Sequence, residues 1–335
     1  MNIIVEKPGL LTTIQDTGRT GYGKDGVSIT GAMDRPAHMI ANWLIGNTGQ
    51  EPTLEITLSG FAVEFTADCW IAVTGGQLTP VVNAQLLPMW RPVYVRKGSR
   101  LSFKKVESGC RAYLAVAGGW QAPSVMGSAS TYLRAGIGGQ NGRALREGDI
   151  LSTSSGQLMP LKLSIEPDRM TSLHTVSWQV SSLLLPSQTG KPVIRIIPGR
   201  EWGDFSTASQ QSLLEESYRV TPQSDRMGYR LSGSVLELKS ARDYLSEAVA
   251  HGTIQVPADG QPIILMADRQ TLGGYAKIAQ VISLDLPVMA QLAPGDYVRF
   301  EMVSIGEAQQ RYGTWVRELH VLRRMIEQKL KDLHS

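Results

Sequence analysis

The polar residues that could do chemistry gather just after one short apolar run. Ile263–Met266 has the length and composition of a buried strand, and Asp268, Arg269, Gln270 and Thr271 follow it before two glycines. A carboxylate, a guanidinium, an amide and a hydroxyl delivered together at a strand end can hold a small polar substrate. The same residues could instead form a solvated turn, because polar clusters of this kind are common in surface loops.

Two arginines four positions apart form a second polar group. Arg226 and Arg230 flank Gly228, and Asp225 precedes them. A guanidinium forms paired hydrogen bonds with carboxylate or phosphate oxygens, so this spacing suits an anion. The alternative is an ion pair that fixes a turn, and the spacing is compatible with both.

Other patterns lack the context that their chemistry needs. Gly18–Lys24 has the spacing of a phosphate-binding loop, but Asp25 stands where a Ser or Thr would bind magnesium. Gly136–Arg143 does not open a helix, so it predicts a loop with close backbone contacts rather than a dinucleotide site. The 5 histidines show no metal-ligand spacing, and Cys69 and Cys110 lack the flanking residues of nucleophilic cysteines. We therefore expect neither a metal site nor covalent catalysis.

Composition bounds the protein class. A chain of 335 residues can form two domains, and 19% charged with 42% hydrophobic residues is typical of a globular protein. The net charge of +3 without a basic block favours neither nucleic acid nor a membrane surface as a partner. No apolar run approaches the roughly 20 residues of a membrane span, and the N-terminus is too polar for a signal peptide. Two cysteines without a pairing framework indicate reduced thiols, so we expect a cytoplasmic protein.

Short β-favouring runs between glycines and prolines predict a mainly β fold. Three glycine turns that lead into strands, at 97–101, 147–151 and 294–298, suggest barrels or sandwiches built from related pieces. The predicted strands are Asn2–Val5, Thr53–Leu58, Ala62–Phe65, Trp70–Thr74, Val93–Val95, Leu101–Phe103, Ala112–Ala117, Thr175–Val180, Val193–Ile197, Leu236–Leu238, Ile254–Val256, Ile263–Met266 and Tyr297–Glu301.

Helix signals are fewer. Asp34 is the expected N-cap of a helix that reaches about Ile45, and short helices are predicted over 210–216 and from Lys277 to between Val281 and Leu284. A long helix is predicted from Glu307 to about Leu333. Its apolar stripe must be buried against the chain's own barrel or against a partner; it consists of Trp315, Leu319, Leu322, Ile326, Leu330 and Leu333.

Several motifs, in order along the chain, resemble one family. They are Thr12–Arg19, Gly31–Asp34, Ala41–Asn42, Gly46–Asn47, Leu54–Thr57, Ala117–Gly119, Gly127–Ser128, Ser130–Thr131, Ser224–Leu231 and Gly252–Tyr275. The chain is identified on these motifs as a member of the KipA family, also called the 5-oxoprolinase C-subunit family, which is grouped with biotin-dependent carboxyltransferase (allophanate hydrolase subunit-like) domains. The resemblance runs from about residue 3 to residue 303.

The resemblance implies a tandem of cyclophilin-like β-barrels, in agreement with the strand-rich pattern. We expect a first barrel region over residues 1–188, a second barrel over 189–304 and an amphipathic helix over 305–335, with the junction near Pro186–Gly190. The C-terminal helix lies beyond the family core.

The resemblance also implies an activity. Family members act with a KipI-like subunit and a LamB/YcsF-like subunit to open 5-oxoproline to L-glutamate at the expense of ATP. This chain would be a hydrolase subunit that is inactive alone, because it has no credible phosphate loop and ATP use would need the assembled complex. Two alternatives stay open. One is a carboxyltransferase that uses carboxybiotin, as in urea carboxylase; the other is a non-catalytic antagonist of a KipI-like histidine-kinase inhibitor.

Site residues follow from the same resemblance. Opening a lactam needs a polarised carbonyl, a bound anion and a base for water. We expect Arg226 and Arg230 to hold anionic oxygens and Asp268 to act as a base or an orienting carboxylate. The expected substrate-binding residues, which include the group that would bind the amide, are Gln255, Gln270, Thr271, Tyr275, Asp34 and Asn42. Leu272 and Ala276 depart from the Thr and Pro expected around Gly273–Tyr275, which weakens a direct catalytic role for that turn.

Overall fold

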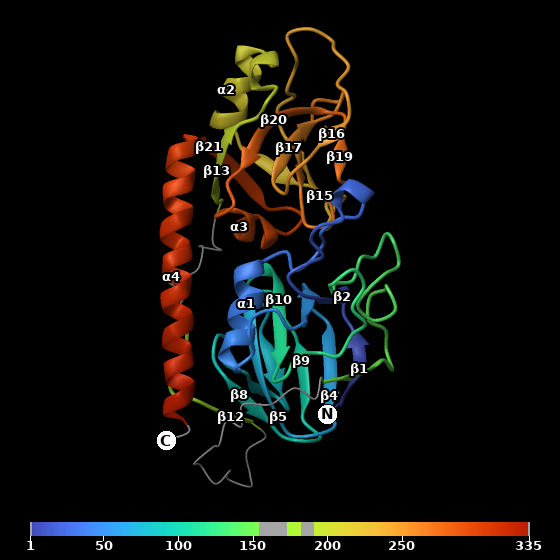
Figure 1. Cartoon of the computed structure of the whole chain (residues 1–335), viewed down its shortest axis with the longest axis vertical. Coiled ribbons are helices and arrows are strands. Elements are labelled where there is room, and N and C mark those ends of the chain that lie inside the picture. The colour runs from blue at the N-terminus through green and yellow to red at the C-terminus, as the bar shows by residue number, and fades with distance from the viewer. Residues whose placement is uncertain (1, 154–172, 182–190, 334–335) are drawn as a thin grey trace. The chain divides into compact units, whose positions relative to one another are not determined.

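The computed structural model describes residues 2–153, 173–181 and 191–333 (Figure 1). Two compact units make up the chain. The first contains residues up to Arg19, 34–185 and 318–335; the second contains Thr20–Met33 and 186–317. The junction predicted near Pro186–Gly190 falls largely outside the described residues, so that boundary stays a prediction. The segment Thr20–Met33 thus belongs to a unit that is otherwise built from the second half of the chain.

Among the described residues, the first unit contains two six-stranded sheets, helix α1 (Arg35–Leu44) and the last part of the C-terminal helix. One sheet has the order β11-β1-β4-β9-β6-β7 and the other β12-β8-β5-β10-β3-β2. The strands are β1 Asn2–Pro8, β2 Leu11–Gln15, β3 Thr53–Thr57, β4 Phe61–Phe65, β5 Cys69–Gln77, β6 Pro80–Val82, β7 Gln85–Leu86, β8 Val93–Val95, β9 Arg100–Phe103, β10 Ser108–Val116, β11 Ile150–Ser152 and β12 Leu173–Thr175.

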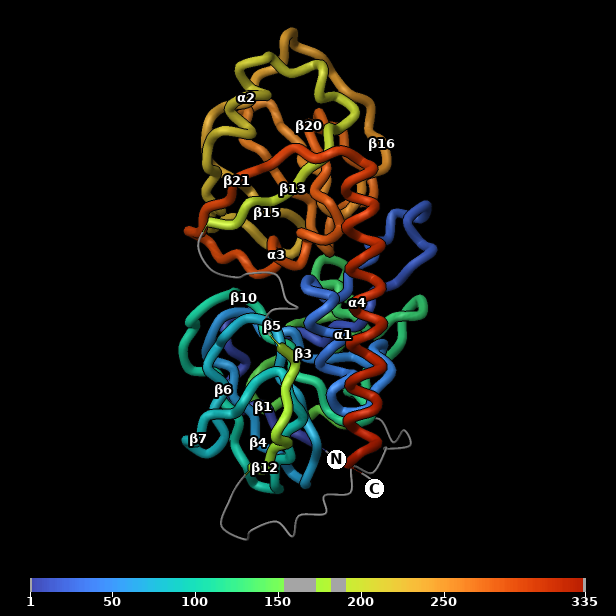
Figure 2. The backbone as a smooth tube through the Cα atoms, turned by 90° about the vertical axis from the view of Figure 1, so that its left-hand side faces the viewer, coloured from blue at the N-terminus to red at the C-terminus, as the bar shows by residue number. Residues whose placement is uncertain are grey.

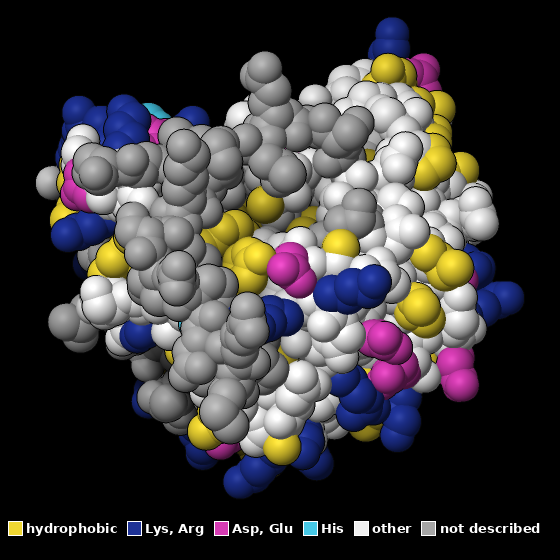
Figure 3. Space-filling view, turned by 90° about the horizontal axis from the view of Figure 1, so that it is seen from below, with side chains coloured by type: hydrophobic (Ala, Val, Ile, Leu, Met, Phe, Trp, Pro, Cys, Tyr) yellow, Lys and Arg dark blue, Asp and Glu magenta, His cyan; other side chains and the backbone are white. Residues whose placement is uncertain are grey.

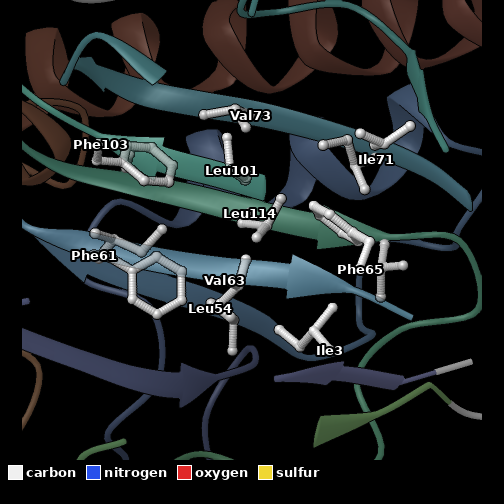
Figure 4. Close-up of a cluster of buried hydrophobic side chains, with 14 of the residues drawn as sticks. Ile3, Leu54, Phe61, Val63, Phe65, Ile71, Val73, Leu101, Phe103 and Leu114 are labelled. Atoms are coloured by element: carbon white, nitrogen blue, oxygen red, sulfur yellow. The ribbon is translucent and has the colours of Figure 1, made fainter. Parts of the chain in front are cut away.

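The core of the first unit lies between these sheets. Apolar side chains from both sheets point toward one another, and Figure 4 shows Phe61 and Val63 of β4, Val73 of β5 and Leu114 of β10 in this cluster. Alternate residues of β4 face inward, as expected for strands covered on one face. In the view from below in Figure 3, lysine, arginine, aspartate and glutamate side chains are interspersed with hydrophobic ones on the surface that is not grey.

The second unit contains a closed seven-stranded barrel with the order β13-β20-β17-β18-β15-β14-β21 (Figure 2). Its strands are β13 Val193–Pro198, β14 Tyr218–Val220, β15 Gly228–Ser232, β17 Thr253–Val256, β18 Ile263–Leu265, β20 Ala276–Val281 and β21 Tyr297–Met302. A separate two-stranded sheet pairs β16 (Glu247–Ala248) with β19 (Leu272–Gly273). Its helical elements among the described residues are η1 Gly23–Asp25, η3 Trp202–Asp204, α2 Thr207–Glu215, α3 Leu286–Ala290 and the first part of the C-terminal helix. The mainly β prediction is confirmed.

Helix α4 (Ile305–Asp332) contributes residues to both units. Its Leu322, Ile326 and Leu330 are buried within the chain, so this part of the predicted stripe packs on the protein itself. The Arg323 guanidinium lies 5.8 Å from the centre of the Trp43 ring of α1. Among the described residues, no helix is both long and apolar enough to cross a bilayer.

Three predictions about elements are wrong. Lys277–Val281 is not helical but forms most of β20, which hydrogen-bonds to β13 on one side and β17 on the other. The strand predicted at Thr175–Val180 is observed earlier, as β12, which ends at Thr175. Leu236–Leu238 has only an isolated bridge, from Leu238 to Phe205. Gly136–Arg143 is a loop with close backbone contacts, as predicted: a Cβ at Gly138 would lie 2.1 Å from the Ser130 carbonyl oxygen.

Candidate functional site

A buried ion pair joins two turns at one end of the barrel. Arg226 precedes β15 and Asp268 follows β18, and these strands are neighbours in the barrel. Arg226 Nε lies 2.9 Å from Asp268 Oδ2, and Arg226 Nη2 lies 2.9 Å from Asp268 Oδ1. Both residues are only 4% exposed. The paired geometry and burial show that the guanidinium and the carboxylate satisfy each other.

The same arginine also holds the segment Thr20–Met33. Arg226 Nη2 donates a hydrogen bond to the Gly31 carbonyl oxygen at 2.6 Å, and Met33 lies in the hydrophobic cluster of the barrel. Arg230, by contrast, is exposed on β15. Because Arg226 is buried against Asp268 and Arg230 is on the surface, the structure does not bring the two guanidiniums together as a fork.

Two glutamines predicted to bind an amide do meet. Gln270 Nε2 lies 3.4 Å from Gln255 Oε1, and Gln255 is 1% exposed on β17. Gln255 Nε2 is buried and has no hydrogen-bond partner among the described residues. A Cβ at Gly273 would lie 2.3 Å from this nitrogen, so only glycine leaves room for it. An unpaired buried N–H costs free energy, and a carbonyl ligand would recover part of that cost.

A pocket of about 500 Å³ lies beside these residues within the second unit. One wall is the turn around η1 and the other consists of β16, β19 and the residues before β19. Ser28 Oγ donates to the Arg269 carbonyl oxygen at 2.6 Å, which joins the walls. The lining residues are Gly23, Lys24, Gly26, Val27, Ser28, Ile29, Ala248, Val249, Arg269, Gln270, Thr271 and Leu272.

Arg269 is the largely buried cation of this pocket. Its Nε makes one long hydrogen bond, 3.5 Å to the Val249 carbonyl oxygen, and no carboxylate of the described residues lies within ion-pair distance. Removal from water lowers the pKa of the Arg269 guanidinium. The Thr271 hydroxyl has no hydrogen bond to a described residue, while its carbonyl oxygen accepts one from the Val249 N–H at 3.1 Å. The pocket therefore presents an uncompensated positive charge beside a hydroxyl and an amide.

The other predicted site residue of the second unit, Tyr275, lies outside the pocket. Tyr275 is 51% exposed and does not line the pocket. Sequence reasoning missed Lys277, whose ammonium lies 3.7 Å from Glu201 and 3.6 Å from Glu247. Lys277 lies opposite Gln255 in the pairing of β20 with β17. A strand prediction would have placed it beside Gln255, but the local sequence pattern predicts a helix there.

Asp34 and Asn42 belong to the first unit, where both make structural contacts. Asp34 Oδ1 accepts from the Ala37 N–H at 3.0 Å, which caps α1 as predicted. Asn42 Nδ2 donates to the Glu51 carbonyl oxygen at 2.9 Å, and its Oδ1 accepts from Asn47 at 2.8 Å. Their predicted role in substrate binding stays a prediction.

Sequence reasoning also missed a buried polar group beneath α1. His38 is fully buried with Nδ1 2.8 Å from Thr53 Oγ1, and its Nε2 has no hydrogen-bond partner among the described residues. Burial lowers the pKa of His38 to about 4. Nearby, Tyr113 donates to Glu55 at 2.9 Å and accepts from the Asp34 N–H at 2.7 Å. Within the described residues, no three His, Cys, Asp or Glu side chains are arranged to hold a metal ion.

Two β-rich units, with a pocket beside the barrel of the second unit, define the class of this protein by its fold. Comparison with known proteins is more specific. Residues 25–302 match the family model described as "Carboxyltransferase domain, subdomain A and B". The chain therefore belongs to the carboxyltransferase-domain family.

Relatives fall into two groups. The chain is 41% identical to the 5-oxoprolinase C-subunit of Escherichia coli over 313 residues, which covers 91% of this chain and 94% of the relative. It is 33% identical to urea amidolyase of Saccharomyces cerevisiae, covering 90% of this chain but 17% of that protein. The crystal structure of the Kluyveromyces lactis urea amidolyase matches 95% of this chain and 20% of that one, with a TM-score of 0.84 and 30% identity.

Proposed function

We propose that this chain is the C-subunit of an ATP-dependent 5-oxoprolinase and that it works with KipI-like and LamB/YcsF-like subunits to open 5-oxoproline to L-glutamate. The observation that carries the proposal is the match to a 5-oxoprolinase C-subunit over nearly its full length. Water adds to the lactam carbonyl, the ring C–N bond breaks, and the ring nitrogen takes a proton. ATP is used by the assembled complex.

The site offers groups suited to a lactam. Gln270 and Thr271 line the pocket with an amide and a hydroxyl. The buried Gln255, which does not line it, orients the Gln270 amide through its Oε1. Asp268 is held by Arg226, so an orienting role suits it better than that of a free base. These groups position a substrate, and the proposal leaves the phosphate chemistry to the complex.

The test is ATP-dependent release of glutamate from 5-oxoproline by the three co-purified subunits, with each subunit omitted in turn. We expect activity only with the full set. Gln255→Leu should lower kcat/KM by about tenfold or more, because the Gln270 amide loses the oxygen that orients it toward the pocket. Gln211→Leu, which changes an exposed glutamine of α2, is the matched control. A complex that assembles but releases no glutamate would rule the proposal out.

A second function is favoured by the matches to urea amidolyase. In that case the chain would transfer a carboxyl group from carboxybiotin. Dependence on a biotin-carrying protein, with activity abolished by avidin, would distinguish it. A chain that binds a KipI-like partner tightly without either activity would support the regulatory alternative.

A further inference from the structure

The pocket beside Gln270 combines features that suit a negatively charged ligand. Arg269 and Lys24 line it, and no aspartate or glutamate does so among the described residues. Lys24 is exposed on η1, whereas Arg269 is largely buried. The lining of this partly enclosed space therefore carries positive charge and no carboxylate.

Hydrogen bonds of the Arg269 backbone fix the position of this residue, and its side chain forms no ion pair with a described residue. Its carbonyl oxygen accepts from Ser28 at 2.6 Å and its N–H donates to the Met266 carbonyl oxygen at 3.2 Å. The guanidinium keeps most of its five N–H groups uncommitted, because its one hydrogen bond, to Val249, is long. A cation removed from water is stabilised when an anion binds it through paired hydrogen bonds.

We infer that this pocket binds the carboxylate of a small ring substrate, with Arg269 as the principal ligand and Lys24 as an accessory cation. The apolar side chains of Val249 and its neighbours cover the ring, and Thr271 contributes a hydroxyl. The choice of 5-oxoproline as one probe rests on the proposed function, because that lactam carries a carboxylate on its ring. The Gln270 amide, which lines the same pocket and is oriented by Gln255 Oε1 at 3.4 Å, would then contact the lactam while Arg269 holds the carboxylate.

The test compares three ligands on the assembled complex without ATP, by ligand-observed NMR. They are 5-oxoproline, 2-pyrrolidone, which is the same lactam without the carboxylate, and cyclopentanecarboxylate, which has the carboxylate without the lactam. We expect both carboxylates to bind at least about tenfold more tightly than 2-pyrrolidone, since a charge-assisted hydrogen-bonded pair is lost with the carboxylate.

Variants locate the effect. Arg269→Gln should remove the preference for carboxylates, Arg269→Lys should keep part of it, and Lys24→Gln should weaken it slightly. Arg299→Gln, which removes an exposed arginine of β21 outside the pocket, should leave it unchanged. Since the charge of Arg269 has no carboxylate partner to lose, Arg269→Gln should lower Tm by less than about 2 °C, which separates lost binding from unfolding.

Each outcome decides the inference. It is overturned if the parent complex binds carboxylates no better than 2-pyrrolidone, if Arg269→Gln keeps the preference, or if inorganic phosphate binds through Arg269 and the carboxylates do not. Turnover in the same preparations is scored separately. If cyclopentanecarboxylate binding depends on Arg269 but no glutamate is released, the carboxylate-binding inference is supported and the proposed function is rejected. If glutamate is released but carboxylate binding is the same in Arg269→Gln, the proposed function is supported and the inference is rejected.

Discussion

Two adjacent residues, Asp268 and Arg269, carry opposite charges and have opposite surroundings. Asp268 is buried against Arg226, whereas Arg269 faces a pocket without an acidic partner. Breaking a buried ion pair leaves an uncompensated charge inside the protein, but removing an unpaired charge leaves none. Substitutions at Arg226 and Arg269 should therefore differ in their effect on folding.

Arg226→Ala is expected to lower the free energy of unfolding by about 3–5 kcal/mol, because the buried Asp268 carboxylate then loses its paired guanidinium. Urea unfolding followed by circular dichroism measures this. The double variant Arg226→Leu with Asp268→Leu should recover much of the loss, since both charges are gone. A loss below about 1 kcal/mol in Arg226→Ala would contradict the structural role of the pair. Loss of activity in this variant thus reports folding as well as catalysis.

His38 makes the first unit sensitive to acid. Its pKa is 6.5 when unfolded and about 4 when folded, so the unfolded chain binds the proton more readily. Stability is therefore full above pH 6.5 and falls as the pH drops toward 4. Between pH 7.5 and 4.5 the free energy of unfolding should fall by about 2–3 kcal/mol from this group.

Urea titrations at several pH values measure the effect of His38. The decrease in the free energy of unfolding with falling pH should be smaller in His38→Gln and unchanged in His174→Gln, which changes a less buried histidine of the same unit. If the pH dependence of the free energy of unfolding is unchanged in His38→Gln, a group other than His38 is responsible for it.

The sequence predicted correctly those elements whose ends are fixed by contacts between residues close in sequence. Asp34 caps α1 because its side chain accepts from a backbone N–H three residues on. The sequence of β20 predicts a helix because Ala, Lys and Gln are good helix formers, but its pairing with β13 and β17 prevails over this preference.

The candidate site was predicted only in part, and for a physical reason. The polar residues after β18 are evident in the sequence, since they follow a buried strand directly. The opposite wall of their pocket comes from Ser28, 241 positions away from Arg269 in sequence. The unpaired amide of Gln255 depends on the close approach of Gly273. No local pattern encodes such contacts between distant segments.

The cap of α1 tests the role of Asp34. Asp34→Ala should cost about 1 kcal/mol of stability, while Asp34→Asn should retain most of it, because an amide oxygen can still accept from the Ala37 N–H. Thermal unfolding and glutamate release by the complex are measured together. If Asp34→Asn is as stable as the parent but inactive, Asp34 contacts substrate as well as capping the helix.

Helix α4 offers a matched pair of neighbouring residues. Ile326 is 2% exposed and Met325 is 62% exposed. Ile326→Ala should lower the free energy of unfolding by about 2–5 kcal/mol, and Met325→Ala by less than about 0.5 kcal/mol. Equal effects in urea unfolding would indicate that the buried face of α4 is not packed on the chain.

At the scale of the whole molecule, the chain passes between the two units after Arg19, Met33, Leu185 and Arg317. A fragment of residues 191–317 lacks Met33 of the barrel core and the Gly31 oxygen that Arg226 binds. We expect this fragment alone to unfold without cooperativity in urea. Joining residues 20–33 to it through a flexible linker should restore a cooperative transition, and an unlinked fragment that folds well would contradict this.

The insertion of Thr20–Met33 into the second unit has a consequence for how such proteins can be recombined. A crossover at 186–190 between two members of the family would combine a barrel from one parent with a pocket wall and a core methionine from the other. The hybrid would inherit mismatched halves of one pocket. With the substrate bound in this pocket as we propose, exchange of substrate preference between relatives should require two transplanted segments, the second unit and the fourteen residues Thr20–Met33 that complete it.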